Sequence, residues 1–521
     1  MNTKKAQTLT RVLLVLGILI LINFISVRLF SRIDLTKAGV YTLADASKLL
    51  VRNLDDRVTV KAYFTEDLPA PYNNNRRAVL DILNEYKAYA KGNLYYEFIN
   101  PEGEKNEREA QQAGIPPVEV QVVKEDKFEV KRAFLGLVLL YEDRKETLPV
   151  IQNLGSLEYD ISSAIKRLTT RTKKRIGYTT GHQEAALTSM QRANQDISAQ
   201  YDVVPVDLSS SSAVIPQDLA ALLVIAPAIK FADTAKYQID QYIMHGGKVA
   251  FLLNKMNASL RAENQYGRPI AQPMELGLED MLENYGIRVN SDLVRDAQCA
   301  SVTVMQQQGP FQMQSQLPFP YLPNAVNMDR SNPIVKDLQG IIFYFVSSLD
   351  TSLAASRGLT ADVLVRSSKH SGRQPGMIML DPMKRYTNEE LAESSIPLAA
   401  VVSGSFKSFF EGKSPVPQTT KSPDTRIVVV GDGDFMKDDF AGSRSNLTFF
   451  MNIVDFLADD AGLITIRSKN VSMPPLDQVS DGVKKMLKYG NLLLPPLLVI
   501  AYGLLRWRRR VALKRSLESH L

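Results

Sequence analysis

The residues best suited to chemistry follow an apolar run at 175–179 that predicts a strand, a place where α/β proteins carry functional loops. Gly181 is followed there by His182, Gln183 and Glu184. An imidazole can act as a general base or a ligand, and a nearby carboxylate can orient it. The same residues also fit a purely structural turn, which glycine permits. Because no partner nucleophile is apparent nearby, we favour the structural interpretation and keep the three polar residues as candidate ligand-binding residues.

A second candidate lies in Gly431-Asp432-Gly433-Asp434-Phe435, directly after an apolar run. Two carboxylates at this point could bind a cation, but the sequence does not continue into an EF-hand loop with its distal glutamate. Aspartates after strands also accept hydrogen bonds from turn amides, and we favour this interpretation. Asp432 and Asp434 therefore remain candidate ligand-binding residues. The sequence has no Gly-x-Ser-x-Gly elbow, P-loop or dinucleotide fingerprint.

Cysteine and histidine counts limit the other kinds of site. The 521 residues include one cysteine, Cys299, and four histidines. A single cysteine forms no intrachain disulfide and no Cys-x-x-Cys motif, and the histidines are too few and scattered for a multi-histidine metal centre. The sequence therefore predicts no cofactor, no metal and no catalytic residue, which is the pattern of a protein that is not an enzyme.

The segment 489–507 is predicted to cross a membrane. It begins with seventeen uncharged residues, the lower limit for a hydrocarbon core about 30 Å thick. Pro495 and Pro496 are better tolerated in a membrane helix than in a soluble one, and Trp507 and Arg508 follow where interfacial anchors lie. A buried core helix is the alternative, but the six cations that begin at the end of this run argue against it. We assign these four residues as membrane anchors.

An apolar run from Val12 to Val27 predicts another span at 12–30. A cleaved signal peptide is the alternative, but no small-residue cleavage site directly follows the run. Cations flank this span evenly, whereas at the second span more of them lie after it, so the positive-inside rule places both termini in the cytoplasm. About 460 residues between the two spans are then expected to be extracytoplasmic.

The charge distribution bears on the expected partners. The formal net charge of +6 arises from the basic flanks of the two predicted spans, and the large middle of the chain is near neutral. The basic character therefore reflects membrane topology, so that nucleic-acid binding loses its main support while contact with membrane lipid is expected.

The region 31–172 is predicted to form a thioredoxin-like α/β domain. Its expected strands are 58–64, 94–99, 118–123 and 131–141, and its expected helices lie around 79–90, 104–112 and 157–168. This order of strands and helices is the one a thioredoxin-like domain has. Because the catalytic cysteines of that fold are absent, the domain would serve as a platform.

The region 173–470 is predicted to form a Rossmann-like, doubly wound sheet. Its expected strands are 175–179, 203–206, 222–227, 249–253 and 426–430, with helices after 184, from 233 and from 445. Continuous apolar runs of this kind suit strands that are buried on both faces of a parallel sheet. A juxtamembrane linker is expected at 471–488, and cytoplasmic ends are expected at 1–11 and 508–521.

Two segments of this region are less regular. The stretch 306–323 is rich in glutamine and proline and predicts a surface loop or bent hairpin, with a partner-contact segment as the alternative. The stretch 404–425, in which phenylalanines alternate with lysines and prolines, predicts a mobile arm.

The order of short motifs resembles a known family, the GldG-like auxiliary, substrate-binding-like subunits of gliding-motility-type ABC transporters. The motifs are Leu157-Glu158-Tyr159-Asp160-Ile161, Thr180-Gly181-His182-Gln183-Glu184, Leu223-Val224-Ile225-Ala226-Pro227, Gly246-Gly247-Lys248-Val249, Gly431-Asp432-Gly433-Asp434-Phe435 and Ile466-Arg467-Ser468-Lys469. They lie between two apolar terminal runs, and the resemblance covers nearly the whole chain. It implies assembly with a polytopic permease and a cytoplasmic ATPase, and the expected localisation is therefore the bacterial inner membrane, with the bulk of the chain in the periplasm. The family's second domain is similar to class I amidotransferase-like folds, yet no cysteine occupies a strand-turn elbow here.

The sequence thus predicts a non-catalytic auxiliary subunit that couples a permease and an ATPase to an unknown periplasmic substrate or protein. One alternative is a membrane-anchored envelope scaffold. The other is a periplasmic hydrolase that uses His182, Glu184, Asp432 and Asp434.

Overall fold

The computed structural model describes most residues between 42 and 459 and a few outside that range. The gaps within this range are 67, 69–71, 125–126, 152–153, 211, 261–268, 309–310, 337, 414–418 and 440–442; the described residues outside it are 14, 17, 464, 466, 482, 486, 488–491, 493, 496, 500–508 and 510. The chain divides into two compact units, Met1–Ser472 and Met473–Leu521.

The predicted membrane spans fall largely outside the described residues. Only Leu14 and Gly17 are described in the span at 12–30, and the span at 489–507 is described in part, with helical residues at 488–491 and 501–508. Pro495 lies outside the described residues, whereas Pro496, Trp507 and Arg508 are helical and exposed. A search of the described residues finds no helix with the length and apolar character needed to cross a membrane.

The first part of the larger unit contains a four-stranded mixed sheet in the order β2-β1-β5-β6. Its strands are β1 (Val58–Phe64), β2 (Leu94–Ile99), β5 (Leu135–Tyr141) and β6 (Arg144–Leu148), and a separate hairpin consists of β3 (Val118–Lys124) and β4 (Lys127–Ala133). Strand β1 pairs parallel with β2 and antiparallel with β5. The strands predicted at 58–64, 94–99 and 118–123 are confirmed within a residue.

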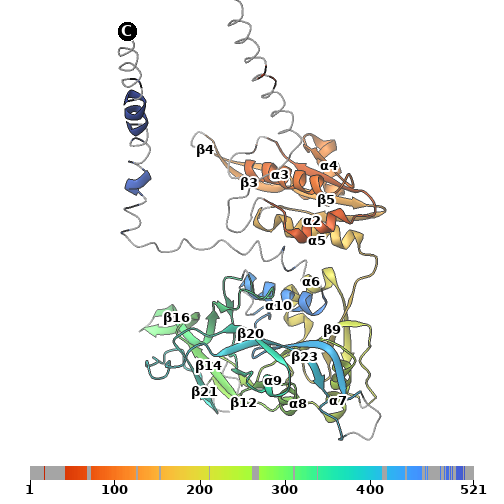
Figure 1. Cartoon of the computed structure of the whole chain (residues 1–521), viewed down its shortest axis with the longest axis vertical. Helices are drawn as coiled ribbons and strands as arrows, with labels where there is room; N and C mark the ends of the chain where they lie inside the picture. The colour runs from red at the N-terminus through yellow and green to blue at the C-terminus, as the bar shows by residue number, and fades with distance from the viewer. Residues whose placement is uncertain are drawn as a thin grey trace, which may run out of the picture. The chain divides into compact units, whose positions relative to one another are not determined.

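Four helices cover the two faces of this sheet. They are α2 (Asp45–Arg52), α3 (Asn73–Tyr89), α4 (Glu104–Gln112) and α5 (Leu157–Thr169), and a short 3-10 turn, η1 (Leu154–Ser156), precedes α5. Alternate residues of β1 and β5 pack with α2, α3 and α5 in one apolar cluster, whereas Tyr63 and Val138 face a smaller cluster with α4. Helices α2 and α5 lie side by side (Figure 1).

The single strand predicted at 131–141 is wrong, because the structure divides it at Phe134. The first half belongs to the hairpin with β3, and the second half, β5, enters the main sheet. Phe134 is buried, its N–H donates to Thr65 Oγ1 at 2.9 Å and its carbonyl accepts the Thr65 N–H at 3.0 Å. These contacts hold Phe134 beside the end of β1, where the chain changes from one sheet to the other.

The second part of the larger unit is built on an eight-stranded sheet in the order β17-β20-β23-β24-β10-β9-β7-β8. Strands β24, β10, β9, β7 and β8 are parallel, while β23, β20 and β17 extend the sheet in antiparallel fashion. The strands are β7 (Arg175–Thr180), β8 (Asp202–Asp207), β9 (Leu219–Ile225), β10 (Val249–Leu252), β17 (Asn327–Met328), β20 (Thr360–Arg366), β23 (Pro397–Lys407) and β24 (Lys421–Val430).

Helices cover both faces of this sheet because its central strands are apolar on both sides. In β24, Val428 and Val430 face one cluster, and Ile427 and Val429 face the other. Helices α6 (Gln191–Gln200) and α10 (Arg444–Leu457) lie on the first face, and α7 (Asp233–Met244) and α8 (Glu279–Asn284) on the second, as Figure 1 shows. A short 3-10 turn, η2 (Leu187–Ser189), precedes α6, and the short helix α9 (Leu353–Ser356) precedes β20.

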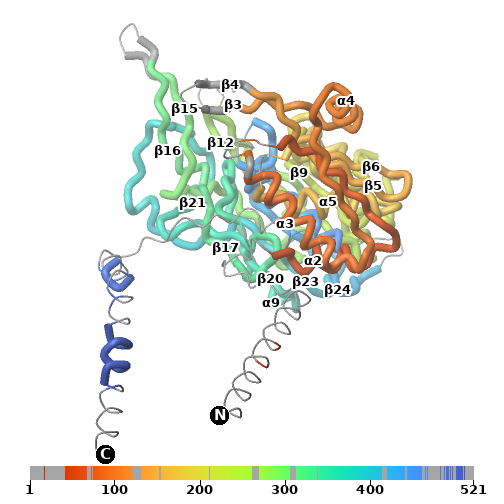
Figure 2. The backbone as a smooth tube through the Cα atoms, turned by 90° about the horizontal axis from the view of Figure 1, so that it is seen from above, coloured from red at the N-terminus to blue at the C-terminus, as the bar shows by residue number. Residues whose placement is uncertain are grey.

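A β-rich insertion separates β10 from β24 and has its own apolar cluster around Phe319, Tyr321 and Phe345. Its remaining strands are β11 (Met256–Ala258), β12 (Ile270–Pro273), β13 (Arg288–Val289), β14 (Asp292–Asp296), β15 (Cys299–Gln308), β16 (Phe311–Ala325), β18 (Ile341–Ile342), β19 (Leu349–Asp350), β21 (Ser371–Pro375) and β22 (Ile378–Met379). The glutamine-rich stretch forms the long hairpin of β15 and β16 (Figure 2), which confirms the hairpin interpretation of 306–323.

The mobile arm predicted at 404–425 is wrong in large part. Its two ends are strand residues of β23 and β24, which pair with each other. Phe406 is fully buried and meets the ring of Tyr285 edge to face, with 5.5 Å between ring centroids. The phenylalanines in this segment therefore supply core contacts, which anchor the polar residues between them.

Candidate functional site

The carboxyl ends of four parallel strands bring the sequence candidates to one edge of the large sheet. His182, Gln183 and Glu184 follow β7, and Asp432 and Asp434 follow β24. Strands β9 and β10 lie between those two strands. At about 4.8 Å per strand, the two candidate loops begin about 14 Å apart. The fold therefore places both loops on one edge but does not join them into one catalytic pair.

His182 is a buried residue whose ring is held by apolar contact. Its side chain is 6% exposed, and its ring stacks on Phe231 with 3.8 Å between centroids and 7° between planes. Its carbonyl oxygen accepts the N–H groups of Ala228 and Ile229, each at 3.0 Å. These bonds tie the loop after β7 to the loop after β9, so His182 serves as a packing and backbone-pairing residue.

Glu184 folds back on His182 without forming an orienting hydrogen bond to the ring. Its Oε2 accepts the His182 backbone N–H at 2.7 Å, while Oε1 lies 3.7 Å from Nδ1. Burial lowers the pKa of His182 and outweighs the opposing effect of the Glu184 charge. The imidazole is therefore neutral near pH 7. Gln183 is exposed and has a φ of +53°, so it occupies the turn itself.

Asp432 is fully buried and accepts two backbone hydrogen bonds. The Tyr344 N–H donates to Oδ2 at 2.7 Å, and the Asp434 N–H donates to Oδ1 at 2.6 Å. Burial, followed by the charge of Asp434, raises the pKa of Asp432 to about 8. Its carboxyl group links the loop after β24 to the segment before β19, and this arrangement agrees with the structural interpretation of the motif.

Asp434 is paired with a cation on its own loop. Its Oδ1 lies 2.6 Å from the Nζ of Lys437, three residues further along the chain. Asn254, which follows β10 and which the sequence analysis did not single out, accepts the Gly433 N–H at 2.7 Å. Among the described residues no group of three or more histidine, cysteine or acidic side chains could hold a metal ion. The cation-binding alternative for Asp432 and Asp434 therefore gains no support from the geometry.

The loops of this edge also bond directly to one another. The Ala185 N–H donates to Ile225 O at 3.1 Å, the Ala226 N–H to Leu252 O at 2.8 Å and the Leu253 N–H to Val430 O at 3.0 Å. A side chain at Gly433 would come within 2.6 Å of Leu252 O. These backbone bonds extend the strand pairing beyond the named strands and hold the neighbouring loops of this edge close together.

The raised pKa of Asp432 should make the stability of the protein depend on pH. A carboxyl group whose folded pKa lies above its unfolded pKa of about 3.9 binds protons more tightly in the folded state. Its favourable contribution is complete at acid pH and is lost as pH rises towards the folded pKa. The stability of wild type relative to Asp432→Asn should therefore fall by about 1.4 kcal/mol per pH unit between pH 4 and 8.

Thermal melting of wild type and Asp432→Asn at pH 5, 6 and 7 measures this difference. At each step to higher pH, the melting temperature of the variant should rise relative to that of wild type. A gap between the two melting temperatures that does not change with pH would contradict the raised pKa.

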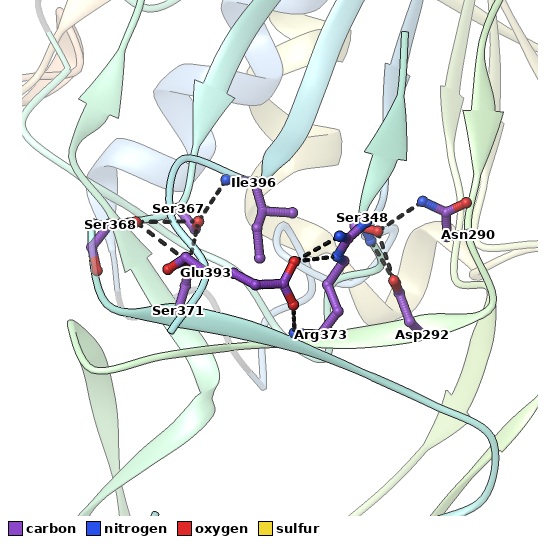
Figure 3. Close-up of polar contacts among 9 residues, drawn as sticks. All are labelled: Asn290, Asp292, Ser348, Ser367, Ser368, Ser371, Arg373, Glu393 and Ile396. Carbon is purple, nitrogen blue, oxygen red and sulfur yellow. Dashed lines mark hydrogen bonds and ion pairs between the residues drawn. The ribbon is translucent and has the colours of Figure 1, made fainter. Parts of the chain in front are cut away.

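A cluster of polar side chains in the insertion escaped the sequence analysis (Figure 3). Ser348 donates to both carboxylate oxygens of Asp292, from its N–H at 2.8 Å and from its hydroxyl at 2.7 Å. Arg373 pairs with Glu393 through Nε at 2.7 Å and Nη2 at 2.6 Å. These bonds join residues that are far apart in sequence, so no local sequence pattern predicts them. Because the groups satisfy one another, the cluster stabilises the insertion.

Comparisons with known proteins give two regions of family similarity. Residues 173–459 match the family described as "ABC-type uncharacterized transport system". Residues 37–140 match the family described as "Domain of unknown function (DUF7088)".

Individual proteins add little functional detail. A protein of Borreliella burgdorferi (strain ATCC 35210 / DSM 4680 / CIP 102532 / B31), described as "Uncharacterized protein", is 22% identical over 529 residues, which cover 98% of this chain and 99% of the relative. A solved structure, "mmIFT52 N-terminal domain", is 13% identical, with a TM-score of 0.32 over 55% of this chain and 97% of that one. This last likeness is too slight to define the fold.

Proposed function

The chain belongs to the ABC-type uncharacterized transport system family, and we propose that it is a non-catalytic auxiliary subunit of a bacterial inner-membrane ABC transporter. Its auxiliary, transport-related role follows from the family. The finer proposal is that it couples a polytopic permease and a cytoplasmic ATPase to a periplasmic substrate or protein. The GldG-like motif order supports this assignment.

The observation that supports the non-catalytic part is the burial of His182 and Asp432 at the carboxyl edge of the large sheet. His182 is buried against Phe231, and Asp432 accepts two backbone N–H groups. A general base must reach the proton that it removes, and a nucleophile must lie within hydrogen-bond reach of its base. Among the described residues His182 Nδ1 has no hydrogen-bond partner. This geometry supports the non-catalytic proposal over the hydrolase alternative.

The membrane part of the proposal rests on the sequence. Two uncharged terminal runs, with a basic cluster after the second, support two anchors with both termini in the cytoplasm. The regions 31–172 and 173–470 would then lie in the periplasm as a thioredoxin-like and a Rossmann-like domain. Anchoring at both ends would transmit movement of the permease to these domains, a role that freely diffusing binding proteins do not have.

Co-purification tests this function. The full-length chain, with an affinity tag, would be extracted from its native membrane in a mild detergent, and the proteins that accompany it would be quantified by mass spectrometry. We expect a permease and an ATPase at a fixed ratio to the chain.

Recovery of the chain alone, or with envelope enzymes and no transporter components, would contradict the proposal. A tagged, unrelated two-span inner-membrane protein extracted in the same way gives the background level of permease and ATPase.

A further inference from the structure

A cavity of about 580 Å³ lies where α5 meets α6 and α10, away from the carboxyl edge described above. Its lining combines a few apolar side chains with many polar ones: Leu148, Tyr159, Asp160, Ser163, Arg167, Asp196, Ala199, Gln200, Gln339, Arg444, Ser445, Leu447, Thr448 and Met451. Ligand pockets in proteins typically range from about 300 to 1,000 Å³. The volume therefore suits a small molecule and is too small for a polymer.

Two buried polar atoms in this lining have no partner in the described part of the chain. Ser163 is 3% exposed, and its Oγ makes no hydrogen bond. Gln200 donates from Nε2 to the Tyr159 hydroxyl at 2.6 Å, which leaves its Oε1 without a donor. A buried polar group without a partner costs about 1–3 kcal/mol. A ligand that supplies hydrogen bonds to Ser163 and Gln200 would remove this cost.

The N-terminus of α10 gives the cavity a preference for negative charge. Ser443 occupies the N-cap position but makes no side-chain hydrogen bond to the helix, and Arg444 and Ser445 of the first turn line the cavity. The first N–H groups of a helix and its dipole attract anions. Arg444 is exposed, and its charge opposes the rise that burial causes in the pKa of Asp160, although no described carboxylate lies within ion-pair distance of its guanidinium. Its guanidinium is therefore available to an oxyanion, whereas Arg167 is already paired with Glu146 at 3.0 Å.

The acidic residues of the lining indicate that the ligand also carries hydrogen-bond donors. Asp160 lies on α5 and Asp196 on α6, and both border the cavity. A bare polyanion would meet these carboxylates, whereas a molecule with hydroxyl groups can donate hydrogen bonds to them and to Gln200 Oε1. The cavity thus combines an anion-binding end with hydrogen-bond acceptors.

We propose that this cavity binds a small polyhydroxylated oxyanion, with its anionic group at Arg444 and the N-terminus of α10 and its hydroxyl groups on Ser163, Gln200 and Asp160. The ligand would bridge α5, which precedes the linker at 170–174, and α6, which follows it. It would therefore fix the first part of the larger unit against the second. The inference goes beyond the proposed function and does not depend on the transporter partners.

Binding can be measured on the purified full-length chain in detergent by titration calorimetry. Glucose 6-phosphate and gluconate are the probes, because they present a phosphate ester and a carboxylate on similar polyols. Glucose is the uncharged control. We expect one of the two anions to bind and glucose to bind much more weakly, and the anion that binds identifies the kind of oxyanion.

Variants place the binding in this cavity. Arg444→Gln removes the unpaired guanidinium and should weaken binding at least about tenfold, the loss expected for a charge-assisted hydrogen bond. Ser163→Ala removes only a hydroxyl and should weaken binding by a smaller factor. Arg357→Gln is the matched control, since Arg357 is exposed at the end of α9 and forms no ion pair with a described residue; it should bind as wild type does.

Absence of binding by both anions at millimolar concentration would overturn the proposal, as would binding that Arg444→Gln and Ser163→Ala leave unchanged. Neither result affects the co-purification test, which concerns partner proteins and not this cavity.

Discussion

Replacing Gly431 by alanine is expected to destabilise the protein by about 3 kcal/mol or more. The added Cβ would lie 2.0 Å from the carbonyl oxygen of Ser347. Backbone bonds hold this glycine from both sides, since its N–H donates to Leu398 O at 3.0 Å and its carbonyl accepts the Ser347 N–H at 2.8 Å. A Cβ has no rotamer and the Ser347 carbonyl belongs to the main chain, so no side-chain adjustment relieves this clash. One of the two backbone segments must therefore move.

That movement would disturb more than the strand end. Ser347 donates its hydroxyl to Asp292 O at 2.8 Å, and the adjacent Ser348 binds the Asp292 carboxylate. The insertion is therefore fastened to the large sheet at the point where Gly431 leaves β24. We expect the segment around Ser347 and Ser348 to exchange its amide hydrogens faster in Gly431→Ala than in wild type.

Thermal melting of the full-length variant in detergent measures the loss, with Gly376→Ala as control. Gly376 has a φ of +81° but nothing within 4 Å of a Cβ. Alanine there costs only the left-handed backbone conformation, about 1–2 kcal/mol. Equal melting temperatures for the two variants would show that the backbone contact at Gly431 is unimportant.

Glu158→Ala is expected to lower the free energy of unfolding of the first part of the larger unit by about 3 kcal/mol. Glu158 is buried on α5, and its Oε1 accepts the Ala44 N–H at 2.6 Å and the Ser47 hydroxyl at 2.7 Å. It thus caps the N-terminus of α2 from a distant helix. Truncation leaves the buried Ser47 hydroxyl and the partly buried Ala44 N–H without their acceptor, and an unsatisfied buried donor costs about 1–3 kcal/mol.

The surrounding network links this glutamate to a third helix. The Tyr86 hydroxyl, on α3, donates to Glu158 O at 3.0 Å and lies 2.6 Å from Ser162 Oγ. Loss of the carboxylate should therefore speed amide exchange in α2 first, while α3 keeps its contact with the Glu158 backbone.

Hydrogen exchange followed by mass spectrometry gives this readout together with the melting temperature. Glu158→Gln keeps a carbonyl oxygen as acceptor and should therefore lose less stability than Glu158→Ala. Glu104→Ala removes an exposed ion pair with Arg108 and should change stability by less than about 0.5 kcal/mol. A Glu158→Ala protein with unchanged exchange in α2 would rule out the capping role.

The apolar periodicity of the sequence predicted most of the regular elements, including the strands at 58–64 and 175–179 and the helix from 445, which the structure has at 58–64, 175–180 and 444–457. These segments carry an alternating, continuous or helical apolar pattern that local backbone geometry enforces. The predictions from the sequence were wrong around Phe134 and Phe406. Both segments carry apolar residues, but the sheet or core in which each one packs is formed by segments distant in sequence.

The candidate residues show the same limit. The positions of His182 and Asp432 after strands follow from the sequence, because a doubly wound pattern places such loops at one edge. Their burial does not follow, since it depends on Phe231, Tyr344 and the bonds between neighbouring loops.

By itself, the sequence determined the α/β class, the near-neutral middle between basic ends and the absence of an intrachain disulfide, because these follow from composition and local periodicity along the chain. Only the tertiary structure decided what particular polar residues do: Glu158 caps a distant helix, and Ser163, Gln200 and Arg444 meet at one cavity. Hydrogen bonding and burial depend on which groups meet in space, and residues more than 240 positions apart line the same cavity here.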